Sequence, residues 1–274
     1  MLEILHDLFS YTFIVRALIV GTLVSLCAAL LGVSLVLKRY SMIGDGLSHV
    51  GFGALAVAMA FNWAPLPVAI PVVVVAAFLL LRLSENSKIK GDSAIALIAS
   101  RSLAIGVTVI SLASGQNADV YSYMFGSILA MKESDVYVSI ALSVVVLILF
   151  IVFYNKIFAV TFDENFAKAT GTRANLYNML IALLTAVTIV VGMRIMGTML
   201  ISSLIIFPAL SAMRIFRQFR SVVIASAAIS IICFFIGLVA SYAFSTPTGA
   251  SIVIVNLIVF LLCFAAGLIR KKAA

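Results

Sequence analysis

Charged residues are scarce in this chain of 274 residues. Only 10% of its residues are Asp, Glu, Lys or Arg, whereas 64% are hydrophobic. In an average soluble domain about a quarter of the residues are charged. The hydrophobic residues here form runs long enough to cross a bilayer, which takes about 20 residues each. The composition therefore predicts a membrane protein with almost no room for a soluble domain.

Cysteines are rare, and the common enzyme motifs are missing. The cysteines Cys27, Cys233 and Cys263 all lie inside apolar runs, so the sequence has neither a CxxC pair nor a disulfide framework. No Gly-Lys dipeptide occurs, which excludes a nucleotide-binding loop of the G-x-x-x-x-G-K-S/T type. H-E-x-x-H and G-x-S-x-G are absent, and Ser251 has no base placed with it. These absences disfavour an intramembrane hydrolase.

The apolar runs predict an all-α fold, a polytopic transmembrane bundle of about eight or nine spans that forms a single domain over residues 1–274. The predicted spans are 14–37, 47–62, 65–83, 93–114, 134–154, 176–193, 196–213, 221–244 and 250–269. Pro208 should kink or interrupt the seventh of them. The segment Asp119–Met131 is too short for a span, and we expect it to be a re-entrant or surface helix on the outer side.

The net charge of +8 reflects topology rather than a nucleic-acid partner, because the basic residues lie in short gaps between apolar runs. Most of the 18 Lys and Arg residues fall in one set of alternating gaps. The opposite set holds only Arg16, Lys132 and Arg194, while Arg101 lies inside the fourth span. Lys and Arg are enriched in cytoplasmic loops. We therefore predict a cytoplasmic C-terminus, an external N-terminus and contact with membrane lipid.

An aspartate and a histidine lie at the start of the second apolar run. Ionisable groups inside a membrane are costly and by default indicate function. Spaced i and i+4, Asp45 and His49 share one helix face and can contact one cation. A carboxylate with an imidazole suits Zn²⁺, Mn²⁺ or Fe²⁺ better than Cu(I) or alkali ions. The pair predicts a metal path.

Two ligands are too few for tight binding, so a second copy of the chain could supply the same pair across a two-fold axis. The small residues between Gly51 and Ala60 allow close helix packing, either within the chain or between subunits. A second interpretation, which is compatible with the metal path, makes Asp45 the N-cap of a helix starting at Gly46, with His49 bonded to a neighbouring carbonyl.

Other residues in the spans have weaker functional interpretations. Met193, Met196 and Met199 could bind Cu(I), but methionine more often fills gaps in apolar packing. Arg101 has no partner that the sequence identifies, because Asp92 lies too far along a helix that rises about 1.5 Å per residue. We expect Arg101 to pair with an acid, line an aqueous path or reach outward.

Five segments of the sequence, taken together, resemble a known family. They are Lys38–His49, Tyr123–Leu129, Asp163–Gly171, Gly197–Ala209 and Thr246–Val253. Over most of its length the chain is similar to the membrane-permease subunits of bacterial ABC importers for zinc and manganese. Arg101 departs from that family, where a small or neutral residue is expected.

The resemblance implies a type II-like importer permease in the bacterial inner membrane. It implies a homodimer, cytoplasmic ATP-binding subunits that hydrolyse ATP, and an extracytoplasmic metal-binding protein. The chain itself would be a translocation subunit rather than an enzyme, with Zn²⁺ or Mn²⁺ as cargo and no permanently bound cofactor. Asp45 and His49 match the acid and the histidine of the metal path.

The resemblance also implies that a polar segment near residues 161–174 is the helix that docks on the ATP-binding subunit. Its matching residues are Asp163, Glu164, Phe166, Ala167 and Gly171. Glycine readily takes a left-handed conformation, so Gly171 is expected to end this helix.

The sequence leaves two possibilities for the transported ion and two for the energy source of transport. Asp and His without further obvious oxygen ligands favour Zn²⁺ over Mn²⁺. A proton-driven secondary transporter is the alternative to the ABC importer, but such proteins need several buried ionisable relays. Only Asp45, His49 and Arg101 could serve here.

Overall fold

The computed structural model describes residues 12–86, 91–113, 124, 126, 133–198 and 200–273. Within these ranges all regular structure is helical, which confirms the predicted all-α fold. The helices are α2 (Thr12–Leu37), α3 (Ile43–Ala60), α4 (Pro65–Asn86), α5 (Gly91–Leu112), α7 (Glu133–Val152), α8 (Tyr154–Phe162), α9 (Glu164–Ala169), α10 (Ala174–Met196), α11 (Ile201–Ile215), α12 (Phe219–Phe244) and α13 (Thr248–Ala273).

Eight of the described helices are long and apolar enough to cross a bilayer. They confirm the predicted polytopic bundle, and their ends lie close to the predicted ones. The seventh predicted span is the exception, because its helix α11 has only 15 residues and begins at Ile201 rather than at 196. Gly197, with φ of +86°, ends α10 and separates it from α11. Pro208 is buried within α11 and does not interrupt it.

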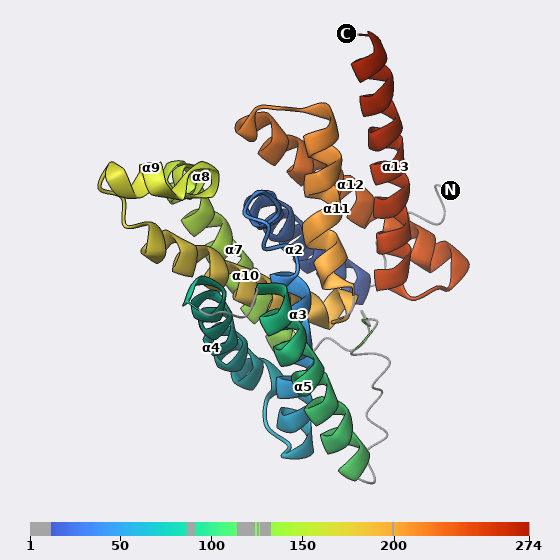
Figure 1. Cartoon of the computed structure of the whole chain (residues 1–274). Helices are drawn as coiled ribbons and strands as arrows, with labels where there is room; N and C mark the ends of the chain where they lie inside the picture. The colour runs from blue at the N-terminus through green and yellow to red at the C-terminus, as the bar shows by residue number, and fades with distance from the viewer. Residues whose placement is uncertain are drawn as a thin grey trace.

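Helix α2 lies in the middle of the bundle and contacts α7, α10, α11 and α12 (Figure 1). Small residues permit this close packing: a Cβ on Gly32 would clash with the carbonyl oxygen of Ile205 in α11. Hydroxyl groups add polar contacts between α2 and α12. Ser226 donates to the carbonyl of Ala29 at 3.2 Å, and Ser230 donates to that of Ser25 at 3.0 Å.

Helices α3, α4 and α5 form a separate group on one side of this centre (Figure 1). Helix α3 contacts both of its group neighbours and also α10 and α11, so it joins the group to the rest of the bundle. Helix α5 contacts mainly α3, and much of its apolar surface faces outward. The short helices α8 and α9 lie together on another side, next to one end of α7 and α10.

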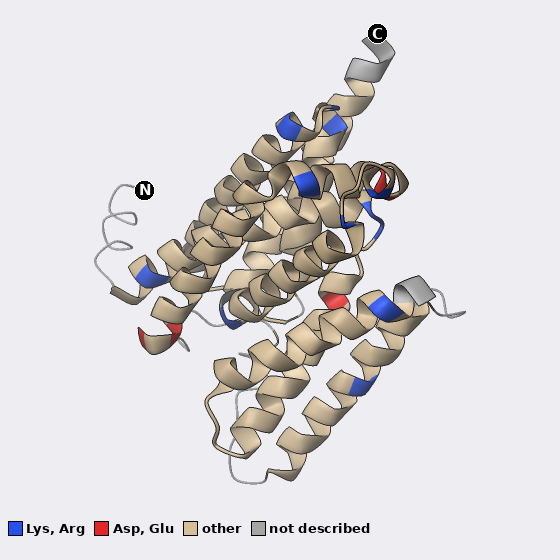
Figure 2. Ribbon diagram, turned by 90° about the vertical axis from the view of Figure 1, so that its left-hand side faces the viewer, with Lys and Arg blue, Asp and Glu red and all other residues tan. Residues whose placement is uncertain are grey.

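Lys and Arg gather around the end of the bundle from which the C-terminus projects (Figure 2). Acidic and basic residues pair at the other end of α7 and α10. There Arg194 donates to Asp135 at 2.6 Å with both side chains largely buried, and Arg16 pairs with Glu133. The asymmetry agrees with the charge pattern of the sequence. The cytoplasmic position of the C-terminus stays a prediction.

Parts of the sequence interpretation fall outside the described residues. The predicted outer helix Asp119–Met131 and the segment Tyr123–Leu129 are described only at Met124 and Gly126. Met199 also lies outside the described ranges. What the sequence predicts for these residues therefore remains a prediction.

Candidate functional site

Asp45 lies inside the first turn of α3 and does not cap the helix. The helix begins at Ile43, and its N-cap Met42 makes no side-chain capping bond. The amide of Gly46 donates to the carbonyl of Met42 at 3.1 Å, so the helical bonding already includes Asp45. The N-cap interpretation of Asp45 is therefore wrong. Its carboxylate still lies near a helix N-terminus, where the helix dipole favours negative charge.

Asp45 and His49 face the same side of α3. The His49 Nε2 atom lies 3.7 Å from Asp45 Oδ2, too far for a good hydrogen bond. The Nδ1 atom of His49 is buried, and no group in the described part of the chain forms a hydrogen bond with it. The expected bond from His49 to a neighbouring carbonyl is thus not observed there. The two side chains are close enough to contact one ion, and neither uses its lone pairs in a hydrogen bond to the other.

Most of the rest of α3, from Ile43 to Ala58, is buried within the chain. A Cβ on Gly46 would lie 2.7 Å from Ile95 Cγ2, and one on Gly53 would lie 2.7 Å from the carbonyl oxygen of Ser102, both residues being in α5. A Cβ on Gly51 would lie 2.7 Å from Met193 Sδ in α10. Packing within one chain therefore accounts for these small residues. They are not by themselves evidence for a subunit interface.

The side chains of Asp45 and His49 interrupt this burial, with 38% and 14% of their surfaces exposed. Together with Met42, which is half exposed, they form a stripe at the start of α3. The described residues contain no group of three or more His, Cys, Asp or Glu side chains that could hold a metal ion. Asp45 and His49 can thus supply a carboxylate oxygen and an imidazole nitrogen, which is half of a four-coordinate set.

The methionines and Arg101, the other candidates from the sequence, lie in different environments from Asp45 and His49. Met193 and Met196 are both only 1% exposed and belong to the hydrophobic core, as expected of methionines that fill packing gaps. Arg101 is exposed on α5, in line with Leu97 and Ile105 on its outward face. Within the described ranges no ion pair involves Arg101.

The chain after α7 folds as two short helices, α8 and the polar helix α9, and the ends of α9 are well defined. Asp163 caps α9, because its Oδ1 accepts the backbone N–H of Phe166 at 2.9 Å. Gly171, which follows the C-cap residue Thr170 of α9, has φ of +80°, and this confirms its predicted part in ending the helix. These two residues determine where the six-residue helix begins and ends.

The other three predicted residues of this segment point in different directions. Phe166 is 65% exposed, and the neighbouring Phe162 is 61% exposed. Ala167 is only 1% exposed and packs with Val160 and Ala174. A contact between the Ala167 side chain and another protein is therefore precluded in this conformation. Phe162, which the sequence interpretation missed, is available at the surface.

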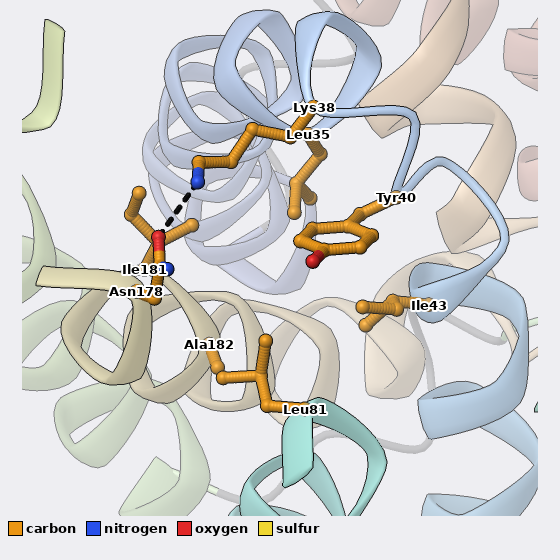
Figure 3. A pocket seen from close by; sticks show the side chains of 8 residues that line it. All are labelled: Leu35, Lys38, Tyr40, Ile43, Leu81, Asn178, Ile181 and Ala182. Carbon is orange, nitrogen blue, oxygen red and sulfur yellow. Dashed lines mark hydrogen bonds between the residues drawn. The ribbon is translucent and has the colours of Figure 1, made fainter. Parts of the chain in front are cut away.

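Glu164 points toward the transmembrane helices. Its carboxylate accepts hydrogen bonds from Lys168 Nζ at 2.8 Å, Asn178 Nδ2 at 3.0 Å and Lys38 Nζ at 3.3 Å. Lys38 also donates to Asn178 Oδ1 at 2.7 Å (Figure 3). Burial raises the pKa of Glu164, but the bonds from Lys168 and Asn178 and the charge of Lys38 outweigh it and lower the pKa to about 2. Glu164 is therefore ionised at neutral pH.

Sequence reasoning missed Lys38 and Asn178. The sequence places Lys38 in a basic gap and at the start of the resembling segment Lys38–His49 but identifies no partner for its side chain, and it places Asn178 inside a predicted span. An amide near the end of an apolar run is a signal that could have identified Asn178, since a buried amide needs hydrogen-bond partners. Its partners are Lys38, in the turn after α2, and Glu164 of α9, which are far apart in the sequence.

Comparisons with known proteins agree with this architecture. The model of the ABC 3 transport family matches residues 10–267. The manganese import system permease protein ScaB of Streptococcus gordonii is 29% identical over 254 residues, which cover 93% of this chain and 91% of that protein. The manganese transport system membrane protein MntC of Halalkalibacterium halodurans is 27% identical over 249 residues, which cover 91% of this chain and 85% of that protein.

A solved structure is also similar. A chain in the structure of PsaBC from Streptococcus pneumoniae in complex with Fab superposes with a TM-score of 0.86 at 29% identity. The match covers 96% of this chain and 94% of that chain.

Proposed function

This chain belongs to the ABC 3 transport family, and we propose that it is the membrane permease of a bacterial importer for a divalent transition metal. The observation that carries the proposal is the placement of Asp45 and His49 on one partly exposed face at the start of a mostly buried helix. In this function the chain moves the ion, and separate cytoplasmic subunits hydrolyse ATP. An extracytoplasmic protein delivers the metal to the outer end of the bundle.

Manganese is the first cargo that we propose, and zinc is the second. ScaB and MntC, the similar permeases, are both named for manganese. The preference for zinc came only from the small number of oxygen ligands, and the names of these relatives do not support it. Two copies of the pair would offer two oxygens and two nitrogens, which either ion accepts. Incomplete coordination suits transport, because the ion must also leave.

A second copy of this chain completes the site in our proposal. The argument rests on the incomplete ligand set and on the exposure of Met42, Asp45 and His49. It does not rest on the small residues of α3, because Gly46, Gly51 and Gly53 pack on α5 and α10 within the chain. A cysteine that reports on the shared interface belongs at Met42, which is 50% exposed. The natural cysteines Cys27, Cys233 and Cys263 must first be replaced.

We assign docking of the ATP-binding subunits to the exposed aromatic residues Phe162 and Phe166. Exposed aromatic side chains are enriched at protein interfaces. Asp163, Glu164, Ala167 and Gly171 then support this surface by shaping α9 and holding it on the bundle.

The test is metal uptake by proteoliposomes that contain the permease, its ATP-binding subunits and the metal-binding protein. ATP should drive uptake of radioactive Mn²⁺, and unlabelled Zn²⁺ should compete less well than Mn²⁺. Asp45→Ala and His49→Ala should abolish uptake at normal membrane abundance. Ile105→Ala, on the outward face of α5, is the control and should retain uptake.

Near-normal uptake by either alanine variant at position 45 or 49 would refute the metal path. Uptake driven by a proton gradient, without ATP or the partner subunits, would instead support a secondary transporter.

A further inference from the structure

Lys38 is a buried cation in the turn that leads from α2 into α3. Its side chain is only 8% exposed, although it directly follows the last residue of α2. A buried ammonium group is stable only if charged or polar partners surround it. Glu164 of α9 and Asn178 of α10 are two such partners, at 3.3 and 2.7 Å. The three residues, which we name the Lys38 triad, therefore join three helices.

The backbone connects Lys38 directly to the start of α3. The amide of Tyr40 donates to the carbonyl of Leu35 at 2.8 Å, and the amide of Ile43 donates to the carbonyl of Tyr40 at 3.0 Å. Arg39, between Lys38 and Tyr40, has φ of +60°, as expected in a tight turn. This turn ends in the first residues of α3, where Asp45 lies. A displacement of Lys38 would therefore be passed to Asp45 through a few bonded residues.

Apolar side chains support the same connection. Leu35, Tyr40 and Ile43 face Ile181 and Ala182 of α10 across a small pocket, and Lys38 reaches Asn178 at its edge (Figure 3). The α2–α3 turn thus rests on α10 through side-chain packing as well as through the triad. Such packed elements move together rather than deform continuously.

The other end of the triad belongs to α9. This helix is held on the bundle by Ala167, which packs on α8 and α10, and by Glu164, which bonds to Lys38 and Asn178. Phe166 lies on the exposed side of the same six-residue helix. A partner that pulls on Phe166 would therefore also displace the Glu164 carboxylate.

We propose that Lys38 is a positioning residue that transmits movement of α9 to Asp45 and His49. The inference rests on the proposed function. A docked ATP-binding subunit moves α9, Glu164 and Asn178 carry the movement to Lys38, and the α2–α3 turn shifts the first turn of α3. The metal ligands thereby change position when nucleotide binds, although they lie on a different helix from the docking surface.

The test measures the number of metal ions transported per ATP hydrolysed by the full complex in proteoliposomes. Lys38→Met and Glu164→Gln should each lower this ratio several-fold, because movement of α9 would no longer reach the α2–α3 turn. The double variant should lower it no further, because both substitutions break one connection. Lys38→Arg, which retains the positive charge, should recover part of the coupling.

Lys168→Met is the matched control. Lys168 bonds to the same carboxylate at 2.8 Å, but it is half exposed and lies within α9 itself. Its loss should leave the ratio within about two-fold of the wild type, because exposed i, i+4 pairs contribute little. A purely structural triad would lower assembly, uptake and ATP hydrolysis together and leave the ratio unchanged. That result, or additive losses in the double variant, would overturn the inference.

Asp45→Ala in the same preparation separates the two proposals. If it transports normally, the proposed function fails whatever the triad does. If it is inactive while Lys38→Met keeps the wild-type ratio, only the inference about Lys38 fails.

Discussion

Two glycines on α3 allow a sharp test of how this helix is held. A Cβ added at Gly51 or at Gly53 would meet its nearest neighbour at the same distance, 2.7 Å. At Gly51 the neighbour is the flexible end of Met193, which can turn aside. At Gly53 it is the backbone carbonyl of Ser102, which cannot move unless α5 moves. Gly53→Ala should therefore be harmful, and Gly51→Ala should be tolerated.

The size of the effect follows from the geometry. Ordinary contact starts at 3.4 Å, so α5 must retreat from Gly53→Ala by about 0.7 Å, and overpacking of this kind costs about 1–3 kcal/mol. Replacing glycine by alanine also stabilises a helix by about 1 kcal/mol, equally in both variants. The difference between the two variants thus isolates the overpacking term. It should be about 1–3 kcal/mol in favour of Gly51→Ala.

Thermal unfolding of the purified variants in one detergent measures this difference. At about 2–4 °C per kcal/mol, Gly53→Ala should unfold several degrees below Gly51→Ala. Uptake by the complex should fall in the same order, because α3 carries Asp45 and His49. Equal unfolding temperatures, or the reverse order, would refute the conclusion that α3 packs on α5 through backbone contact at Gly53.

Three further predictions concern the ends of the bundle. Arg194→Met should destabilise the protein by about 3–5 kcal/mol, because it leaves Asp135 buried without its cation. In thermal unfolding, a double variant that also carries Asp135→Leu should recover most of the lost stability. Glu164 has its pKa lowered from 4.5 to about 2, so its stabilising effect is complete above pH 4.5 and lost as the pH falls toward 2. The Glu164→Gln variant should lose less stability over that window, and equal losses would contradict the ion pairing. Phe166→Ala should weaken co-purification of the ATP-binding subunit without lowering the unfolding temperature, since the ring is 65% exposed; unchanged co-purification would remove Phe166 from the docking surface.

The sequence interpretation was most accurate where local physics dominates. Long apolar runs must form helices in a bilayer, because no water is available to satisfy their backbone groups. Gly171 ends α9 because its positive φ is a local property of glycine. The shared face of Asp45 and His49 follows from the helical repeat alone, and it is found in α3.

The sequence interpretation was wrong about the starts of two helices, where more than one local signal was possible. Asp45 looked like an N-cap, but the turn through Arg39 and Tyr40 lets the helix begin at Ile43. The run after Met196 looked continuous, but Gly197 adopts a positive φ and shortens the next helix. In both cases the preceding residues decided where the helix starts, and hydrophobicity carries no information on that point.

The sequence by itself thus determined the membrane location, the helical class, the approximate spans and the pair of residues suited to a metal ion. Only the tertiary structure decided which of these residues meet. In the folded chain Glu164 points inward to Lys38 and Asn178, Ala167 is buried, and Phe162 and Phe166 are exposed. The small residues of α3 pack on α5 and α10. The physical reason is that periodicity identifies the faces of one helix, whereas the neighbour of each face depends on how distant helices pack together.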